Sequence, residues 1–186
     1  MIRILQLLLA VALLIFACFN YSFAQVPEQF TIKTEDWKSV YENEITMRTI
    51  KDIWGSSNQN IYAVGKSGTI IFYDGNIWSK KASGTNYGLT GIWGSSADNV
   101  YAVGLNGTIV HYNGNVWSKI NNSNNENLMD VWGSSEDNIY AVGTNGTILH
   151  YNGIDWSEIN SGTNINLTAI WGSSAYNIYA VGEKGT

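Results

Sequence analysis

Residues 53–65 read IWGSSNQNIYAVG and decide the fold, because nearly the same phrase returns three more times. The later copies are IWGSSADNVYAVG (92–104), VWGSSEDNIYAVG (131–143) and IWGSSAYNIYAVG (170–182). Two series of tryptophans keep a spacing of 39 residues, namely Trp54, Trp93, Trp132 and Trp171, and then Trp78, Trp117 and Trp156. Residues 92–130 and 131–169 are identical at 25 of 39 positions without a gap. Self-similarity at this period is typical of a solenoid, a propeller or another repeat array.

Each repeat has the composition of short β-strands. The second copy contains LTGIW, NVYAV, TIVHY and VWSKI, which are rich in β-branched and aromatic residues. They are separated by GSSAD, GLNG and NGN, which carry turn residues, and the polar stretch NNSNNEN leads to the next repeat. Four strands of about five residues and four connections account for the period. Because no repeat offers a long window of helical spacing, repeats of paired helices are excluded.

The pattern of apolar residues predicts an all-β fold, a β-propeller of four-stranded antiparallel blades. In the first copy Ile61 and Ala63 point to one face of a strand, whereas Tyr62 and Val64 point to the other. Both faces are therefore apolar, as a blade between two neighbours requires, whereas an ordinary antiparallel sheet exposes a polar face. The predicted repeats are 51–89, 90–128, 129–167 and a partial repeat at 168–186. A parallel β-helix is the main alternative.

The seven periodic tryptophans are predicted to form the structural core of the repeats. A platform of aromatic rings that stacks on sugars is the alternative role for these residues. Residues that recur identically in every blade usually serve the packing between blades, so we favour the core.

The N-terminus has the features of a secretory signal peptide at residues 1–24. Arg3 precedes an apolar run, and Ser22-Phe23-Ala24 resembles a cleavage site. The apolar run is short for a membrane span and no second one follows, so we expect no transmembrane segment after cleavage. We therefore expect an exported protein that is periplasmic, at the cell surface or secreted. Cys18 in a loose lipobox offers a lipoprotein as the alternative.

Charge and cysteine content restrict the partners and the chemistry. The chain carries a formal net charge of −5, and loss of Arg3 makes it more negative. Such acidity argues against nucleic acid or an anionic membrane surface as partner. The single cysteine of the chain, Cys18, lies within the predicted signal peptide. The mature chain would therefore have no disulfide, cysteine nucleophile or thiolate metal site.

The two ends of the repeat region are unequal. Residues 25–50 contain Trp37, whose surroundings match an outermost strand without its three partner strands. At the other end the chain stops at Thr186, about halfway through a repeat. Since propellers typically have 4–8 blades, we expect a fragment of a longer chain. The full gene is expected to continue with Ile, an aliphatic residue, His or Phe, Tyr and then Asn/Asp-Gly.

The phrase WGSSxxNIYAVGxxGTIxHYNGxxWS resembles bacterial exported β-propellers of the neuraminidase-repeat, or Asp-box-like, class. It is also similar to photosystem II assembly and stability factors built from such repeats. The resemblance covers about residues 51–186 and implies a propeller with a binding or assembly role. The strict S-x-D-x-G-x-T-W motif of the class is absent, because this chain has D/N-G-x-x-W at residues 74–78 and their repeats.

The sequence contains no catalytic constellation. Sialidases of this resemblance grip the substrate carboxylate with three arginines, whereas the mature chain has only Arg48. His111 and His150 stand where the first repeat has phenylalanine, which favours a packing role. Asp98 and Asp137 are replaced by uncharged residues in the other copies, which favours turns over a calcium site. We expect no enzyme activity, no metal and no cofactor.

Candidate binding residues lie where the repeats differ. The connections 82–88, 121–127 and 160–166 vary while their flanks stay fixed, and loops on a rigid scaffold often carry binding residues. The candidates are Asn86, Tyr87, Asn125, Glu126 and Asn164, with solvated linkers as the alternative.

The expected function is a non-catalytic exported scaffold that binds a protein or glycan partner in the cell envelope or outside the cell. One alternative is a glycosidase- or lyase-type enzyme whose catalytic residues lie in a missing C-terminal part. Paired carboxylates would be needed for that chemistry, and Glu126 is the only carboxylate in the three variable connections. The other alternative is an assembly factor of the photosystem type.

Overall fold

The computed structural model describes residues 49–186, which belong to one compact unit, Glu35–Thr186. The predicted signal peptide, Cys18 and the predicted strand around Trp37 lie outside the described residues. Within residues 49–186, no helix combines the length and the apolar character needed to span a bilayer.

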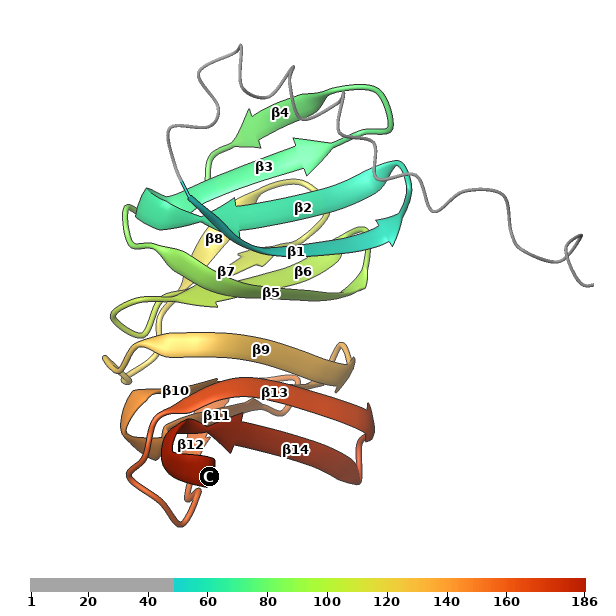
Figure 1. The fold of residues 1–186 in the computed structure, drawn as a ribbon. Helices are drawn as coiled ribbons and strands as arrows, with labels where there is room; N and C mark the ends of the chain where they lie inside the picture. The colour runs from blue at the N-terminus through green and yellow to red at the C-terminus, as the bar shows by residue number, and fades with distance from the viewer. Residues whose placement is uncertain (1–48) are drawn as a thin grey trace, which may run out of the picture. The chain divides into compact units, whose positions relative to one another are not determined.

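Three four-stranded sheets and one two-stranded sheet follow one another along the chain (Figure 1). The first contains β1 (Ile50–Ser57), β2 (Asn60–Gly65), β3 (Thr69–Tyr73) and β4 (Trp78–Lys81). The second contains β5 (Leu89–Ser96), β6 (Asn99–Gly104), β7 (Ile109–Tyr112) and β8 (Trp117–Ile120). The third contains β9 (Leu128–Ser135), β10 (Asn138–Gly143), β11 (Ile148–Tyr151) and β12 (Trp156–Ile159), and the fourth β13 (Leu167–Ser174) and β14 (Asn177–Gly182).

Each sheet is an antiparallel meander, because its strands are hydrogen-bonded in the order of the sequence. This confirms the predicted four-stranded blade and excludes the parallel β-helix. The strands β1, β5, β9 and β13 contact one another in succession, so they are the inner strands of consecutive blades. The strands β4, β8 and β12 lie at the opposite edge of their sheets and are the outer strands.

Consecutive blades pack one face of a sheet against the opposite face of the next. Tyr62 and Val64 of the first blade share a buried cluster with Val100, Ala102 and Val110 of the second. The next seam repeats this packing 39 residues later, with Tyr101 and Val103 against Ile139, Ala141 and Leu149. Burial of both faces is the property that the apolar pattern predicted, and it explains why the blade occurs in series.

The Trp-Gly pair at the start of each copy is a contact between blades. An added Cβ on Gly133 would lie 2.6 Å from Cη2 of Trp93, and one on Gly94 would lie 2.7 Å from Cη2 of Trp54. The indole of each inner strand therefore occupies the space of a side chain on the next inner strand. Trp132 covers Gly172 in the same way.

This contact corrects the interpretation of Gly-Ser-Ser as part of a turn. Gly94 and the two serines after it belong to β5, and only Ala97 and Asp98 form the turn before β6. The inner strands are consequently eight residues long rather than about five. Glycine is needed here because the neighbouring indole leaves no room for a side chain.

The tryptophans of the outer strands also contact the neighbouring blade. Trp117 is 8% exposed and meets Tyr62 of the first blade edge-on, with ring centroids 5.6 Å apart. Trp156 meets Tyr101 in the same way at 6.1 Å. Among the seven tryptophans predicted as core, Trp171 is the most open, 61% exposed, since it lies in the fourth sheet.

Aspartates on two inner strands link neighbouring blades. Asp130 accepts hydrogen bonds from the backbone N–H of Val131 at 2.8 Å and of Ile170, in the next blade, at 2.9 Å. Asp52 accepts from Ile92 of the second blade at 2.8 Å. Burial raises the pKa of Asp130, and the charge of Asp52 adds to this rise, whereas the two N–H groups oppose it. The partly desolvated carboxylate of Asp130 thus joins the third and fourth blades through its two hydrogen bonds.

His111 packs within the second blade, as predicted, and also forms a hydrogen bond. Its ring stacks on Tyr101 with centroids 4.3 Å apart, and Nε2 lies 2.6 Å from Oδ1 of Asn99. Burial lowers the pKa of His111, which favours the neutral ring. In the first blade, Phe72 takes the place of the histidine and packs against Tyr62 at a tilt, with ring centroids 4.7 Å apart. The buried Oδ1 of Asn60 has no hydrogen-bond partner among the described residues.

Phe72→His is expected to stabilise the protein by about 0.5–1 kcal/mol, because the new imidazole supplies the missing partner of Asn60. The reverse change in the second blade, His111→Phe, orphans Asn99 and is expected to cost about 1 kcal/mol. Both are measured as the free energy of unfolding in urea. Equal effects of the two changes, in either direction, would contradict the account.

Candidate functional site

The connections between outer and inner strands gather at one rim of the blades. Each is tied to the tight turn between the second and third strand of a blade. Leu105 donates its N–H to the carbonyl of Gly88 at 2.9 Å, and Gly107 donates to the carbonyl of Glu126 at 2.8 Å. At the other rim the short turns meet, since Gly114 lies against Asp98. The three variable connections therefore share the first rim, which we call the long-loop rim.

Two of the tight turns at this rim, Asn106-Gly107-Thr108 and Asn145-Gly146-Thr147, match the Asn-X-Thr pattern of glycosylation sites. Asn106 and Asn145 adopt φ angles of 56° and 54°, in the left-handed region, and Ser67 takes the same conformation at 55°. The sequence interpretation of these positions as turns is confirmed by this geometry.

The predicted binding residues are distributed along the long-loop rim. Asn86 and Tyr87 lie together in a groove between the first two blades. Asn125 and Asn164 are exposed in the two later connections, and Glu126 is half-buried. The structure thus places all five on one rim but brings only Asn86 and Tyr87 into the same hollow.

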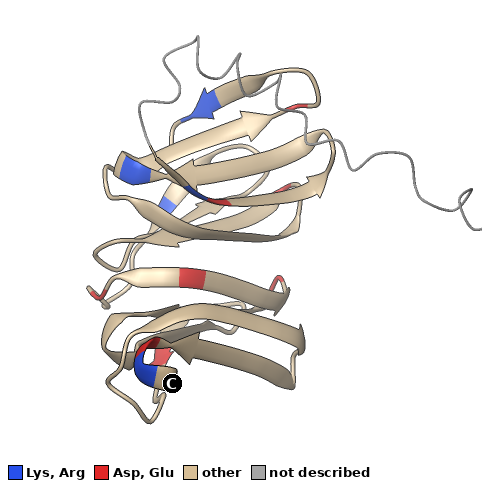
Figure 2. Cartoon of the chain, in the orientation of Figure 1, with Lys and Arg blue, Asp and Glu red and all other residues tan. Residues whose placement is uncertain are grey.

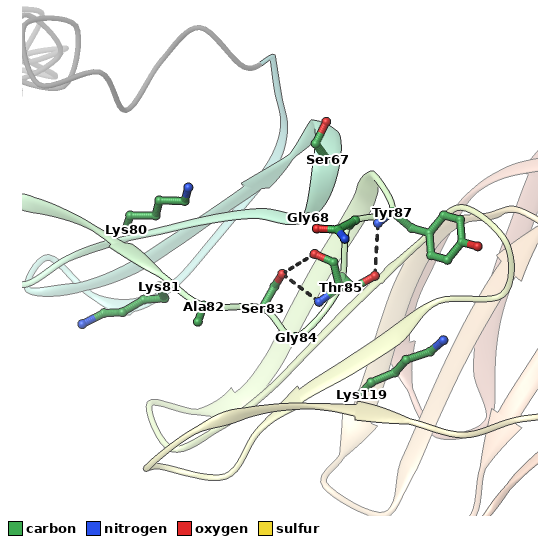
Figure 3. Close-up of a pocket in the computed structure, with 11 residues that line it drawn as sticks. Ser67, Gly68, Lys80, Lys81, Ala82, Ser83, Gly84, Thr85, Tyr87 and Lys119 are labelled. Atoms are coloured by element: carbon green, nitrogen blue, oxygen red, sulfur yellow. Dashed lines mark hydrogen bonds between the residues drawn. The ribbon is translucent and has the colours of Figure 1, made fainter.

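The groove has a volume of about 830 Å³ and lies at the end of β4 (Figure 3). Residues 82–87, the turn at residues 67–68 and three lysines, Lys80, Lys81 and Lys119, line it. Lys80 and Lys81 are consecutive on β4, so their side chains leave opposite faces of the strand and point apart in Figure 3. We call it the lysine groove. Sequence reasoning missed the three lysines because it searched the connections and not the outer strands. The sequence did contain a signal, because one position of the repeat is Lys80 in the first copy, Lys119 in the second and Glu158 in the third.

The connection that forms one wall of the groove is held by its own side chains. Ser83 Oγ donates to the carbonyl of Thr85 at 3.1 Å and accepts from the N–H of Thr85 at 3.3 Å. Oγ1 of Thr85 accepts from the N–H of Tyr87 at 3.1 Å (Figure 3). Gly68 has no room for a side chain, because the carbonyl of Thr85 lies against it. The wall is therefore a braced loop whose Ser83 is buried.

Most lysines of the described residues lie in the first two blades. Five of the six lysines among residues 49–186 belong to the first two blades (Figure 2). The ammonium group of Lys119 lies 6.0 Å from the ring centroid of Tyr87, and that of Lys81 lies 5.0 Å from the ring of Phe72. Within the described part of the chain, Lys80, Lys81 and Lys119 form no ion pair. Lys81 also contributes to the lowered pKa of Asp74, after the hydrogen bonds that Asp74 accepts from backbone N–H groups. Lys80 and Lys119 are therefore the charges best placed to meet an anionic ligand.

A smaller hollow of about 280 Å³ adjoins the lysine groove and shares Lys81 and Ala82 with it. Tyr62, Tyr112 and Trp117 line this hollow. The indole N–H of Trp117 is buried and has no hydrogen-bond partner among the described residues. The seam thus combines aromatic walls with one ammonium group.

The carboxylate of Glu126 is hydrogen-bonded to a neighbouring turn of the long-loop rim. Its Oε2 accepts a hydrogen bond from the hydroxyl of Thr144 at 2.7 Å. This bond, followed by one from Asn145, lowers the pKa of Glu126. An acid whose pKa is lower in the folded state adds stability above its unfolded pKa, and that stability is lost as the pH falls through the folded pKa.

Thr144→Val is expected to raise the pKa of Glu126 toward its ordinary value, because the largest of the stabilising hydrogen bonds is removed. The measurement is an NMR titration of the Glu126 side-chain carboxyl carbon in both proteins. An unchanged midpoint would show that Thr144 does not hold this carboxylate in solution.

Among residues 49–186, no three His, Cys, Asp or Glu side chains are grouped so that they could hold a metal ion.

Comparison with solved structures supports the propeller fold, whereas the sequence comparisons find no relative. No protein-family model matches the sequence, and no curated protein matches it. Among solved structures, the chain is similar to YCF48 bound to D1 peptide, with a TM-score of 0.57 and 16% identity over 73% of this chain and 47% of that one. It is also similar to YCF48 from Cyanidioschyzon merolae, with a TM-score of 0.61 and 14% identity over 74% of this chain and 49% of that one. The chain has the β-propeller fold and spans about half the length of these structures.

Proposed function

We propose that this chain is a non-catalytic, exported propeller scaffold that binds a protein partner through its long-loop rim. The observation that carries the proposal is a division of labour within the repeat. The residues that recur, such as Trp93 and Gly133, make the contacts between blades. The positions that vary, such as the one that holds Tyr87, Glu126 and then Ile165, lie in the connections on one rim, where Tyr87 is exposed. A rigid scaffold with a variable rim is suited to binding.

A peptide or protein is the favoured class of partner. One of the similar propellers is YCF48 in complex with D1 peptide, so a blade architecture of this kind supports peptide binding in another protein. A glycan is the other class that the composition of the rim suits, because asparagine amides and an exposed tyrosine can contact sugars. Site-specific crosslinking and a glycan array separate the two classes.

Two features support a scaffold over an enzyme. The carboxylate of Glu126, the only one in the variable connections, is bound to Thr144. The histidines of the third strands stack on tyrosines and pair with asparagines, as at His150 and Asn138 with 2.7 Å between Nε2 and Oδ1. These groups serve the fold. The alternative is a glycosidase- or lyase-type enzyme whose catalytic residues lie outside this sequence. The experiment below tests for such activity on the full chain.

We propose export on the basis of the signal-peptide features of residues 1–24. A bacterial origin is proposed from the resemblance of the repeats to bacterial neuraminidase-repeat propellers. A second candidate is an assembly factor like the photosystem II proteins. The sequence resemblance of residues 51–186 to such factors favours it, and it would also act by binding a protein.

The test places a photo-crosslinking amino acid on the full chain, at Asn125 or Asn164 on the long-loop rim. Matched positions on the opposite rim are Asn76 and Ile154, which are also exposed and line neither hollow. We expect one protein from the periplasmic and extracellular fractions to be captured from the long-loop rim and not from the other. Capture from both rims alike, selective binding to a glycan array, or turnover of chromogenic glycosides would contradict the proposal.

A further inference from the structure

We propose that the lysine groove binds an acidic peptide segment of the partner, with Lys80 and Lys119 meeting its carboxylates. The inference rests on the proposed function and adds the chemistry of the bound segment. It moves the contact from the rim alone to the seam between the first and second blades, where β4 ends and the connection 82–87 begins.

The charge of the groove is opposite to that of the whole protein. The chain has a formal net charge of −5, yet the groove is lined by three lysines and by no carboxylate of the described residues. An anion that enters the groove meets positive charge and no negative charge from the described lining, which favours its binding. Ammonium groups also form charge-assisted hydrogen bonds with carboxylates, which are stronger than neutral ones. An anionic ligand is therefore the chemistry that this surface selects.

The next seam of the same protein shows that the fold does not require these charges. In the repeat, Lys119, Ile120, Glu126 and Glu158 take the places of Lys80, Lys81, Tyr87 and Lys119. The equivalent places at the next seam thus hold one lysine, which is Lys119 itself, one isoleucine and two glutamates. At that seam Glu158 Oε2 accepts a hydrogen bond from Asn124 Nδ2 at 3.3 Å. Since β8 and β12 form the same strand with either charge, the positive groove is a property of the first seam rather than of the blade.

An extended peptide suits the neutral parts of the groove. Asn86 is exposed, and its side chain forms no hydrogen bond with another described residue. A free amide offers one acceptor and two donors, the complement of a peptide backbone. Tyr87 is 45% exposed and presents a ring for an apolar side chain beside the ammonium of Lys119. Lys80 and Lys81 lie on β4, the edge strand of its sheet among the described residues, where an extended segment can lie alongside.

The test uses the full chain and a fluorescein-labelled decapeptide of alternating glutamate and glycine, measured by fluorescence anisotropy. We expect micromolar binding that weakens as salt rises. The charge reversal Lys80→Glu with Lys119→Glu is expected to weaken binding by at least about tenfold. The matched control reverses Lys51 and Lys184, which are exposed and outside the groove. It changes the net charge equally and is expected to leave the affinity within about twofold.

Each other outcome overturns the inference. Equal losses of affinity in both double variants would show that net charge alone governs binding. If the wild-type protein did not bind the peptide, the groove would not be a site for acidic peptides. Tighter binding of polygalacturonate than of the peptide would assign the groove to an anionic glycan. Should Lys80→Glu with Lys119→Glu fail to fold, the glutamine pair at these positions is expected to weaken binding in the same direction, and an unchanged affinity would overturn the inference. Capture of a partner from Asn125 or Asn164 without peptide binding would overturn this inference and leave the proposed function standing.

Discussion

Gly133→Ala is expected to lower the free energy of unfolding by about 1–3 kcal/mol, although it adds a single methyl group. The new Cβ would lie 2.6 Å from Cη2 and 2.8 Å from Cζ2 of Trp93, closer than carbon atoms can approach. Either the indole of Trp93 or the inner strand β9 must move, and both are packed between the second and third blades. The measurement is urea unfolding followed by far-ultraviolet circular dichroism.

Gly88→Ala is the matched control for this substitution. Gly88 also lies in a backbone conformation that alanine can adopt, and an added Cβ would be 3.5 Å from the nearest atom, a side-chain carbon of Leu105. We expect a change within about 0.5 kcal/mol. If both substitutions were equally tolerated, the indole of Trp93 would not occupy the space above Gly133.

Asp130→Ala is expected to cost about 2–4 kcal/mol, because it leaves two backbone N–H groups without an acceptor. Those groups belong to Val131 in the third blade and Ile170 in the fourth, and both lie next to buried side chains. The same urea titration measures the effect. Hydrogen exchange at the Ile170 amide is expected to become faster, since its acceptor is lost.

Asp155→Ala serves as the control for the loss of an aspartate. Asp155 is exposed and precedes β12, and the change in unfolding free energy is expected to stay within about 0.5 kcal/mol. The pH dependence offers an independent check on Asp130. An acid with a raised folded-state pKa favours the protonated form, so the stability of the wild type relative to Asp130→Ala is expected to fall as the pH rises above the unfolded pKa of about 4. The opposite slope would contradict the burial of this carboxylate.

The period of the repeat was sufficient to predict the strand order and the blade. Because Tyr62 and Val64 alternate with Ile61 and Ala63, the burial of both faces followed from the pattern of one strand. The role of Gly94 did not follow in this way. Its neighbour in space, Trp54, is about 40 residues away in sequence, and only the relative placement of two blades shows that the indole needs a glycine. A local interpretation assigned that glycine to a turn.

The candidate site was predicted less completely. Variation among the connections drew attention to Asn86 and Tyr87, which line the lysine groove. The lysines themselves lie on the outer strands, where Lys80 occupies a place that the sequence pattern assigns to the scaffold. Their convergence with the connection depends on how β4 and β8 of adjacent blades approach each other, which a single repeat does not encode. Links such as Asp130 to Ile170 were missed for the same reason.

The double-mutant cycle of Trp93→Leu and Gly133→Ala tests most directly whether consecutive sheets pack on one another as blades. Removing the indole opens the space that the methyl group needs, so the alanine should cost much less in the Trp93→Leu background. We expect a coupling of about 1 kcal/mol or more between the two residues. A coupling near zero, with additive losses, would show that Trp93 and Gly133 do not touch in solution, and the stacked-blade account would be wrong.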